Sequence, residues 1–242
     1  DDLEPSTTYC YSIEDDNGVA MDRVGFETAP ASGAVCFLAF GDSGNGSVEQ
    51  LALRDQMETV PYDFVLHVGD IAYEDGSLAM FEQNYFDVYA ALIDHFSVFP
   101  VPGNHEYNTA DAAAYREVFT LPNNERWYSF DWGDAHFVAL DTERLGEEQS
   151  SFLEADLAAN TKPWTVVYFH RPPYSSGEHG NNADVEDAFV PILERHRVDL
   201  VLAGHDHDYE RIVPRNGVSY VVTGGGGGGT RAVSESDFTA FV

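Results

Sequence analysis

Five apolar runs of this chain end in the same way, and this repeated layout limits the fold more than any other feature of the sequence. Each run is short and rich in β-branched and aromatic residues, as buried strands are. The polar motifs that follow them are Gly41-Asp42-Ser43-Gly44, Gly69-Asp70-Ile71-Ala72-Tyr73, Gly103-Asn104-His105-Glu106, His170 and Gly204-His205-Asp206-His207. In open α/β sheets, ligands bind beyond the carboxyl ends of the strands. We therefore expect these polar side chains to meet at one edge and to form a site there.

The side chains at these strand ends are suited to binding metal ions. The Asp70 carboxylate can bridge two cations about 3.5–4 Å apart, the spacing that two-metal hydrolytic sites use. Carboxylate oxygen and imidazole nitrogen suit iron, zinc and manganese, and the absence of Cys from all five motifs argues against a structural Cys-type zinc site. Tyr73 is the unusual member, because a phenol with a pKa near 10 becomes a ligand only beside a strong Lewis acid. The residue types therefore predict a two-metal centre.

Each motif also has an ordinary explanation when it is taken alone. Asp42 and Asn104 lie beside glycines in segments typical of turns. His205 and His207 alternate as on an extended segment that faces one side, which can equally be a solvated turn, and Tyr73 can be a capping aromatic. The five motifs together, in this order, favour a metal site. The histidines for which we expect structural roles instead are His67, His95, His136 and His196.

The ordered motifs resemble those of purple acid phosphatases, within the calcineurin-like metallophosphoesterase superfamily. That family's pattern is GDxG, GDxxY, GNH[DE], VxxH and GHxH, and all five occur here in that order, in a resemblance that covers nearly the whole chain. It implies two metal ions bridged by Asp70, namely ferric iron and a divalent iron, zinc or manganese ion. The implied ligands are Asp42, Asp70, Tyr73 and His207 for ferric iron, and Asp70, Asn104, His170 and His205 for the divalent metal.

The resemblance also implies roles for two histidines that do not bind metal. His105 would be the acid near the leaving group. His179 falls where the family places a second histidine that contacts the substrate. Beside it, Gly180 stands where plant members carry another histidine, so we expect weaker phosphate contact at this point.

The reaction implied by the resemblance is hydrolysis of a phosphomonoester with an acidic optimum. A metal-bound hydroxide would attack phosphorus in line, while His105 protonates or stabilises the leaving oxygen and His179 bonds a phosphate oxygen. Two alternatives stay open at this point. One is a phosphodiesterase or nucleotide hydrolase, since a shared fold and shared metals do not set the substrate class. The other is an inactive metal-binding module.

Between the motifs, predicted strands alternate with predicted helices, which indicates an α/β fold. We expect strands at 35–40, 64–68, 98–101, 127–132, 135–141, 165–169, 200–203, 208–213 and 219–223, and helices at 47–58, 78–93, 110–118, 146–159 and 185–197. Parallel units mixed with hairpins predict two packed mixed sheets flanked by helices, and the resemblance implies the same four-layer α/β/β/α sandwich, the metallophosphoesterase fold. The six glycines at 224–229 are interpreted as a tight turn near the metal edge, with a flexible linker as the alternative.

Residues 1–31 differ from the rest and are expected to form a β-hairpin followed by a linker, with strands at 7–13 and 24–28 around a turn at 15–18. This segment resembles the last hairpin of the fibronectin-III-like domain that precedes the catalytic domain in many purple acid phosphatases. We place the catalytic domain at 32–242. An isolated hairpin is marginally stable in water, so this one is expected to pack on the catalytic domain or a partner, or to be partly disordered.

The charge of the chain is extreme. Its 42 Asp and Glu outnumber its 12 Lys and Arg, the formal net charge is −30, and Lys162 is its only lysine. So large an excess opposes folding by self-repulsion unless salt screens it, which favours a halophilic protein over the alternative of an ordinary acidic secreted protein. No basic patch can neutralise a nucleic-acid backbone, so small phosphate esters are the expected partners, with no nucleic acid.

Localisation is predicted from the same sequence. No apolar run approaches the length that spans a bilayer, so no membrane partner is expected. We expect a secreted or extracytoplasmic protein of a high-salt environment, whose export signal lies outside this sequence. Cys10 in the hairpin and Cys36 in the first catalytic strand can pair, but a buried thiol explains Cys36 equally well.

Overall fold

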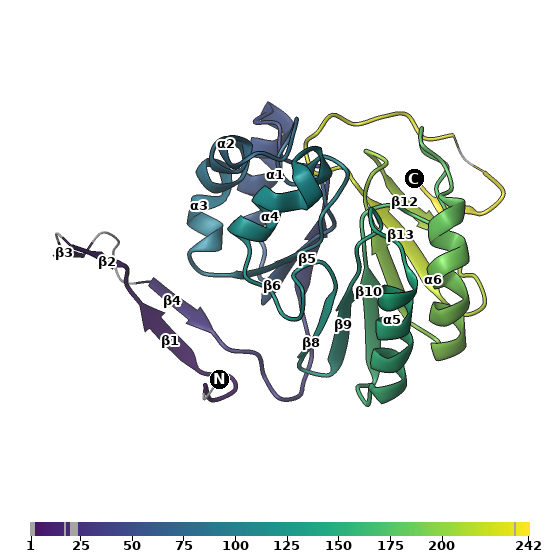
Figure 1. Cartoon of the computed structure of the whole chain (residues 1–242), viewed down its shortest axis with the longest axis horizontal. Coiled ribbons are helices and arrows are strands. Elements are labelled where there is room, and N and C mark those ends of the chain that lie inside the picture. Colours follow the sequence, from purple (N-terminus) through teal and green to yellow (C-terminus); the bar gives the residue numbers. More distant parts are fainter. Residues whose placement is uncertain (1–2, 17, 20–23, 235) are drawn as a thin grey trace.

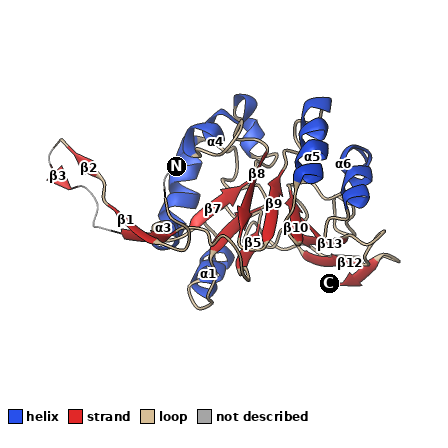
Figure 2. Cartoon of the chain, turned by 90° about the horizontal axis from the view of Figure 1, so that it is seen from below, coloured by secondary structure: helices blue, strands red, loops and turns tan. Residues whose placement is uncertain are grey.

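The computed structural model describes residues 3–16, 18–19, 24–234 and 236–242. Two β-sheets lie face to face in the middle of the molecule, and helices cover the outer face of each (Figure 1). A two-stranded arm at the N-terminus projects from this sandwich (Figure 2). No helix within the described residues combines the length and the apolar character that crossing a bilayer requires.

The smaller sheet consists of three parallel strands in the order β5-β6-β7. Its strands are β5 (Phe37–Phe40), β6 (Phe64–His67) and β7 (Ser97–Pro100). Every residue of the central strand β6 is buried, as expected for a parallel strand that is covered on both faces. The helical segments of this half are α1 (Val48–Met57), α2 (Leu78–Phe81), η1 (Glu82–Phe86), α3 (Asp87–Ile93), η2 (Glu106–Asn108), η3 (Ala110–Ala112) and α4 (Ala113–Val118).

The larger sheet has seven strands in the order β14-β12-β13-β11-β10-β9-β8. Its middle four strands run parallel, while β8, β12 and β14 pair antiparallel at the two sides. The strands are β8 (Tyr128–Trp132), β9 (Ala135–Ala139), β10 (Trp164–Tyr168), β11 (Leu200–Ala203), β12 (Tyr209–Ile212), β13 (Ser219–Thr223) and β14 (Thr239–Phe241). Two helices, α5 (Glu147–Ala159) and α6 (Ala183–His196), cover its outer face.

Helix α6 shows how local sequence sets the helix ends. The Asn182 side chain accepts a hydrogen bond from the backbone N–H of Val185 and so satisfies a donor of the first turn. Acidic residues occupy that first turn and basic residues the last turn, which complements the helix dipole. The helix ends at His196, and the following Arg197 has a left-handed backbone.

Three apolar cores separate the layers. One lies between the larger sheet and its helices and includes Leu153 and Phe189. A second lies between the smaller sheet and its helices. The third joins the inner faces of the two sheets, where Phe64 of β6 packs against Phe137 of β9 at a centroid distance of 5.2 Å. The predicted four-layer α/β/β/α arrangement is confirmed. The prediction that both sheets are mixed is wrong for the smaller sheet, which is wholly parallel in the described residues.

The carboxyl ends of β5, β6, β7, β10 and β11 meet at one edge of the sandwich. Hydrogen bonds join the two sheets there. The N–H of Gly41, just after β5, donates to the carbonyl of Thr223 at the end of β13 (3.0 Å). The ring nitrogen Nδ1 of His170, after β10, lies 2.9 Å from the carbonyl oxygen of Val68, after β6. Residues that are distant in the sequence are therefore brought together at this edge.

The N-terminal arm is a hairpin, as predicted. β1 (Thr8–Tyr11) pairs antiparallel with β4 (Val24–Glu27), and a small ribbon of β2 (Glu14–Asp15) and β3 (Gly18–Val19) extends it. The predicted turn at 15–18 includes Asn17, which lies outside the described residues. The arm contacts the segment after α3, where the Tyr11 hydroxyl donates to the carbonyl of Asp94 (3.3 Å).

The sequence left open whether Cys10 and Cys36 pair or whether Cys36 is a buried thiol. Cys10 and Cys36 are free thiols in the described structure, and both are exposed. Cys36 lies just before β5, where its Sγ contacts the carbonyl of Pro61 (3.3 Å). The predicted strand began at residue 35, whereas β5 begins at Phe37, so the thiol lies outside the sheet and is exposed, which contradicts the alternative of a buried thiol.

Candidate metal centre

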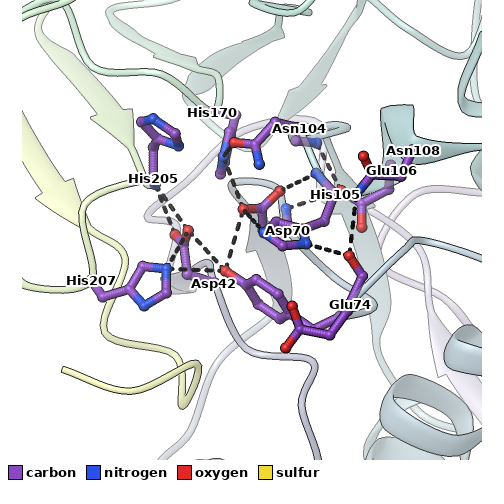
Figure 3. A network of polar contacts seen from close by, with 12 residues as sticks. Asp42, Asp70, Glu74, Asn104, His105, Glu106, Asn108, His170, His205 and His207 are labelled. Carbon is purple, nitrogen blue, oxygen red and sulfur yellow. Dashed lines mark hydrogen bonds and ion pairs between the residues drawn. The ribbon is translucent and has the colours of Figure 1, made fainter. Parts of the chain in front are cut away.

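The seven predicted ligands lie in one place, at the edge where the two sheets meet. Figure 3 labels six of them, and Tyr73 lies within 3.3 Å of Asp42, Asp70 and His207. Asp42 follows β5, Asp70 and Tyr73 follow β6, Asn104 follows β7, His170 follows β10, and His205 and His207 follow β11. All but Asn104, which is partly exposed, are buried. Five strand ends therefore bring the carboxylates, imidazoles, amide and phenol into a single cluster of side chains.

Asp70 lies at the middle of this cluster. Its Oδ2 is 3.3 Å from the Tyr73 hydroxyl on one side and 3.3 Å from Nε2 of His170 on the other. Its Oδ1 accepts a hydrogen bond from the N–H of His105 (2.9 Å). The carboxylate thus has one oxygen facing both groups of predicted ligands, which is the position that a bridging ligand requires.

The first group contains the predicted ligands of the ferric site. The Tyr73 hydroxyl lies 3.3 Å from Oδ1 of Asp42 and 3.1 Å from Nε2 of His207. Nε2 of His207 is also 3.6 Å from Asp42 Oδ1. Three different donor atoms therefore face a common point beside Asp70.

The second group contains the predicted ligands of the divalent site. Nε2 of His170 lies 3.2 Å from the side-chain oxygen of Asn104. Asp70, His170 and His205 each offer one ligand atom, and these atoms lie within 4.8 Å of one another. A single cation can be held by such a cluster of oxygen and nitrogen donors.

Two of the histidines are oriented by backbone carbonyls. Nδ1 of His170 lies 2.9 Å from the carbonyl oxygen of Val68, and Nδ1 of His207 lies 2.8 Å from that of Gly229. A carbonyl only accepts, so in both rings Nδ1 carries the hydrogen. Such contacts fix ring orientation in metal sites and leave Nε2 as the donor atom for the metal.

The buried carboxylates of the cluster favour a positive charge beside them. Burial raises the pKa of the Asp42 carboxyl well above its usual range. Burial acts to lower the pKa of His170, but the adjacent Asp70 carboxylate outweighs it and raises the pKa to about 10. A proton on His170 therefore balances Asp70, and a metal ion at the same place has to displace that proton. Burial lowers the pKa of His205 to about 2, so this ring stays neutral, as a metal ligand must be.

Glu106 is a structural member of the site that the sequence reasoning left without a role. Its fully buried carboxylate accepts hydrogen bonds from four backbone N–H groups. The donors are Asp70 (3.0 Å), Ile71 (2.9 Å), Ala72 (3.1 Å) and Gly103 (2.8 Å). Burial raises its pKa to about 7 against the effect of these donors. Glu106 thereby ties the loop after β6 to the loop after β7, and its place as the last letter of the motif at 103–106 was the available signal.

The two predicted catalytic histidines lie beside different members of the cluster. The Nδ1 of His105 donates to the carbonyl of Glu74, and its Nε2 lies 3.8 Å from Asp70 Oδ2. The exposed ring of His179 stacks on the ring of His205 at a centroid distance of 4.2 Å. Both imidazoles thus border the cluster from partly open positions.

Two arginines near the cluster were not predicted. The guanidinium of Arg171 makes two contacts with the Glu143 carboxylate (2.6 and 3.1 Å) and lies 2.9 Å from Nε2 of His205. Arg231 lies 2.5 Å from Nε2 of His179. Both arginines come from loops without a recurring pattern, so the sequence carried no signal for their position.

The glycine run packs tightly against the cluster, which supports the interpretation as a turn rather than a flexible linker. The N–H groups of Gly226 and Gly228 donate to the carbonyls of Gly41 (2.9 Å) and Asp42 (2.7 Å). A β-carbon on Gly226 would lie 2.1 Å from the Gly41 oxygen, closer than any side chain allows. The run therefore depends on glycine for its close approach to the loop that carries Asp42.

The four histidines expected to be structural lie outside the seven-residue cluster, and each has a partner of its own. These partners are Ser43 for His67, the Gly25 carbonyl for His95, Asp131 and Asp156 for His136, and Glu154 for His196. Burial lowers the pKa of His67 to about 3, so that ring is neutral.

Sequence comparisons show which known proteins the chain is similar to. The chain is similar to acid phosphatase type 7 of Mus musculus, with 31% identity over 251 aligned residues that cover 88% of this chain and 55% of the relative. It is also similar to purple acid phosphatase 21 of Arabidopsis thaliana, with 30% identity over 256 aligned residues that cover 93% of this chain and 56% of the relative. The chain thus spans about half the length of these curated relatives.

Structural comparison gives the same fold. A purple acid phosphatase from seeds of yellow lupin (Lupinus luteus) superposes with a TM-score of 0.83 at 23% identity, over 99% of this chain and 54% of that one. The sequence profile of the calcineurin-like phosphoesterase family matches residues 37–209, the segment that contains all seven clustered residues. This match covers most of the chain, which therefore belongs to the calcineurin-like phosphoesterase family.

Proposed function

We propose that this chain is the catalytic unit of a dinuclear-metal phosphomonoesterase of the acid phosphatase type. The single observation that carries the proposal is the position of Asp70, whose Oδ2 lies 3.3 Å from both the Tyr73 hydroxyl and Nε2 of His170. A carboxylate between two donor groups suits a pair of cations, and two-metal sites are typical of phosphoester hydrolysis. Acid phosphatases among the relatives support the choice of reaction.

The proposed ligands divide into two sets that share Asp70. Ferric iron is proposed at Asp42, Asp70, Tyr73 and His207, and divalent iron, zinc or manganese at Asp70, Asn104, His170 and His205. The phenol of Tyr73 supports a strong Lewis acid in the first set, because burial and the nearby carboxylates raise its pKa and only such an ion would ionise it. When bound, the two ions supply Lewis-acid activation of water and of phosphate oxygens.

The side chains around the cluster would bind and orient the phosphate ester. His105 has its Nδ1 hydrogen committed to the Glu74 carbonyl, so its Nε2 is the atom that can carry a proton to the leaving oxygen. On the other side, His179 and the neighbouring Arg231 present donors to a phosphate oxygen. Arg231 supplies positive charge near Gly180, where the sequence predicted weaker phosphate contact.

The arm and the surface charge support two further parts of the proposal. We propose that residues 1–31 are related to the last hairpin of a fibronectin-III-like domain, because β1 and β4 pair with each other and project from the sandwich formed by 32–242. The net charge of −30 supports a secreted protein that works at high salt on small phosphate esters rather than on nucleic acid.

Metal analysis combined with a substrate comparison tests the proposal. Protein purified without chelator should contain about two metal ions per chain, including iron. It should hydrolyse p-nitrophenyl phosphate faster than bis(p-nitrophenyl) phosphate. Faster cleavage of the diester would favour a phosphodiesterase on the same fold, and two bound metals without hydrolysis of either ester would leave a metal-binding module.

A further inference from the structure

Three buried carboxylates lie next to the segment that carries His205 and His207. Asp206 and Asp208 are in the bend after β11 and Glu210 is in β12, and contacts with residues 175–177 place all three against the loop there. Their relative exposures are 0%, 6% and 0%. They face the loop 175–179, which ends at His179. Burying three carboxylates together is costly unless each is compensated.

Two of the three carboxylates are satisfied by that loop. Asp206 accepts hydrogen bonds from the Ser175 hydroxyl (2.5 Å) and from the N–H of His179 (2.8 Å). Glu210 accepts from the N–H of Ser176 (2.7 Å) and from hydroxyl groups. These neutral donors stabilise the two carboxylates but do not cancel their charge.

Asp208 is different, because neither of its oxygens has a hydrogen-bond partner in the part of the chain that the structure describes. A β-carbon on Gly177 would lie 2.6 Å from Asp208 Oδ2 and 2.4 Å from Asp206 Cγ, so both carboxylates face the same glycine. Within the described ranges no Arg, Lys or His forms an ion pair with Asp206, Asp208 or Glu210. A buried, unpartnered carboxylate beside a second carboxylate therefore calls for a cation.

We propose that Asp208 and Asp206, with the oxygen-rich loop at 175–177, bind a hard cation that is separate from the dinuclear centre. The donors are carboxylate and hydroxyl oxygens, without nitrogen or sulfur, which suits Ca²⁺ and the alkali ions rather than zinc or copper. Ca²⁺ fits best because it balances two negative charges and accepts irregular oxygen coordination. The ion would tie the loop that carries His179 to strand β12.

The test measures cation binding on protein whose dinuclear centre is already loaded. After dialysis against calcium-free buffer, ⁴⁵Ca²⁺ equilibrium dialysis counts bound calcium, and elemental analysis checks that the iron and the divalent metal stay in place. Melting temperatures are followed with CaCl₂, NaCl or KCl, at an ionic strength held constant with tetramethylammonium chloride. Asp208→Asn removes the charge with little change of shape, and Asp187→Asn on the exposed face of α6 is the matched control.

We expect the wild-type protein and Asp187→Asn to bind about one Ca²⁺, with a melting temperature about 5 °C or more higher at a Ca²⁺ concentration about 100-fold above its Kd. Asp208→Asn should bind none and should not respond to Ca²⁺, because the amide removes the unpartnered carboxylate and leaves Asp206 as the only charged ligand of the proposed site. A response to Na⁺ or K⁺ alone that Asp208→Asn abolishes supports the site and assigns it to an alkali ion.

Two results would overturn the proposal. One is a wild-type protein that binds no calcium and melts at the same temperature in all four salts, since Asp208 would then be held as a neutral acid. The other is an equal rise in melting temperature with cations in wild type and Asp208→Asn, which would show that the cation binds at another site. Neither result depends on whether the protein hydrolyses phosphate esters, so failure here is distinguishable from failure of the proposed function.

Discussion

The buried carboxylates of the metal centre and the exposed carboxylates of the outer helices show how burial changes the interactions of the same chemical group. Asp42, Asp70 and Glu106 are almost completely buried, and each contacts specific donors. Glu147 on α5 and Asp187 on α6 are exposed and face solvent. In low dielectric a carboxylate interacts strongly with a few neighbours, whereas an exposed one interacts weakly with many and is screened by salt. The buried group should therefore respond to metals and the exposed group to ionic strength.

Removing the central buried carboxylate should have the largest effect. Asp70→Ala is expected to abolish phosphatase activity and to lower bound metal well below two ions per chain, because Asp70 alone lies between the two sets of proposed ligands. Activity assays and elemental analysis measure both outcomes, with Asp187→Ala as the exposed control. Near-wild-type metal content in Asp70→Ala would contradict the bridging role.

The neighbouring imidazole should affect the reaction rather than the metals. His105→Ala is expected to lower kcat by about 10²–10⁴-fold, the usual contribution of a positioned acid, with metal content unchanged. The loss should be smaller for esters whose leaving group has a low pKa, such as p-nitrophenol. A series of aryl phosphates measures this dependence, and equal losses across the series would exclude the acid role.

The buried phenol offers a spectroscopic test. If Tyr73 binds ferric iron, the protein should show a visible charge-transfer band, and Tyr73→Phe should remove the band while the other ligands keep their metal. Absorption spectra with parallel iron analysis measure this effect. A colourless, iron-free and active protein would show that Tyr73 is only a neighbour of a zinc or manganese centre.

Carboxylates that are only partly buried should have an effect on stability that lies between those of the buried and the exposed groups. His136 lies 2.7 Å from both Asp131 Oδ1 and Asp156 Oδ2. Burial acts to lower the pKa of His136, but the hydrogen bonds to the two carboxylates outweigh it and raise the pKa. The stabilisation of the folded state by protonated His136 is therefore complete below about pH 6.5, the pKa of histidine in the unfolded chain. It is lost as pH rises through the raised pKa of the folded state.

His136→Gln should remove this pH dependence. We expect the variant to lose about 1.5–3 kcal/mol of unfolding free energy at pH 5.5, the usual value of hydrogen bonds to charged groups, and less at pH 9. Denaturant unfolding at the two pH values measures the difference. Equal losses at pH 5.5 and pH 9 would mean that the imidazole contributes by packing alone.

The exposed carboxylates should give the smallest effect per group. The Debye length falls from about 30 Å at 0.01 M salt to about 3 Å at 1 M, so repulsion among them fades as salt is added. Melting temperature and activity should both rise from dilute buffer, with most of the gain reached by about 0.5 M. A melting temperature that is flat or falls between 0.05 and 2 M salt would remove the halophilic interpretation and leave the metal centre untouched.

The sequence predicted most strands, and it predicted that the polar residues after them lie together. It could do so because a short apolar run indicates a buried strand directly. The ends of β5, β6 and β10 lie within two residues of their predicted positions. The strand β14 was not predicted, because its three residues give too short a pattern. Its pairing with β12 depends on a contact between distant parts of the chain.

The residues that hold the candidate ligands in place were harder to predict than the ligands themselves. Glu106 was visible in its motif, but its role depends on N–H groups from two loops that only the folded chain brings together. The contacts of Arg171 and the unpartnered carboxylate of Asp208 likewise arise between segments without a recurring spacing. Patterns along the sequence show which residues are buried, and they do not show which loops meet.

The division of the proposed ligands between the two sheets has a consequence for how the protein assembles. The N–H of His205 donates to the Asp42 carboxylate (2.9 Å) across 163 residues of chain. The first half of the chain supplies Asp42, Asp70, Tyr73 and Asn104, and the second half supplies the three histidines, so neither half alone holds the full set for either ion. Contacts of such high sequence separation form late and slowly. Metal uptake should therefore report the last step of folding, and the loaded ions should keep the two halves associated after a protease cuts the chain between β7 and β8.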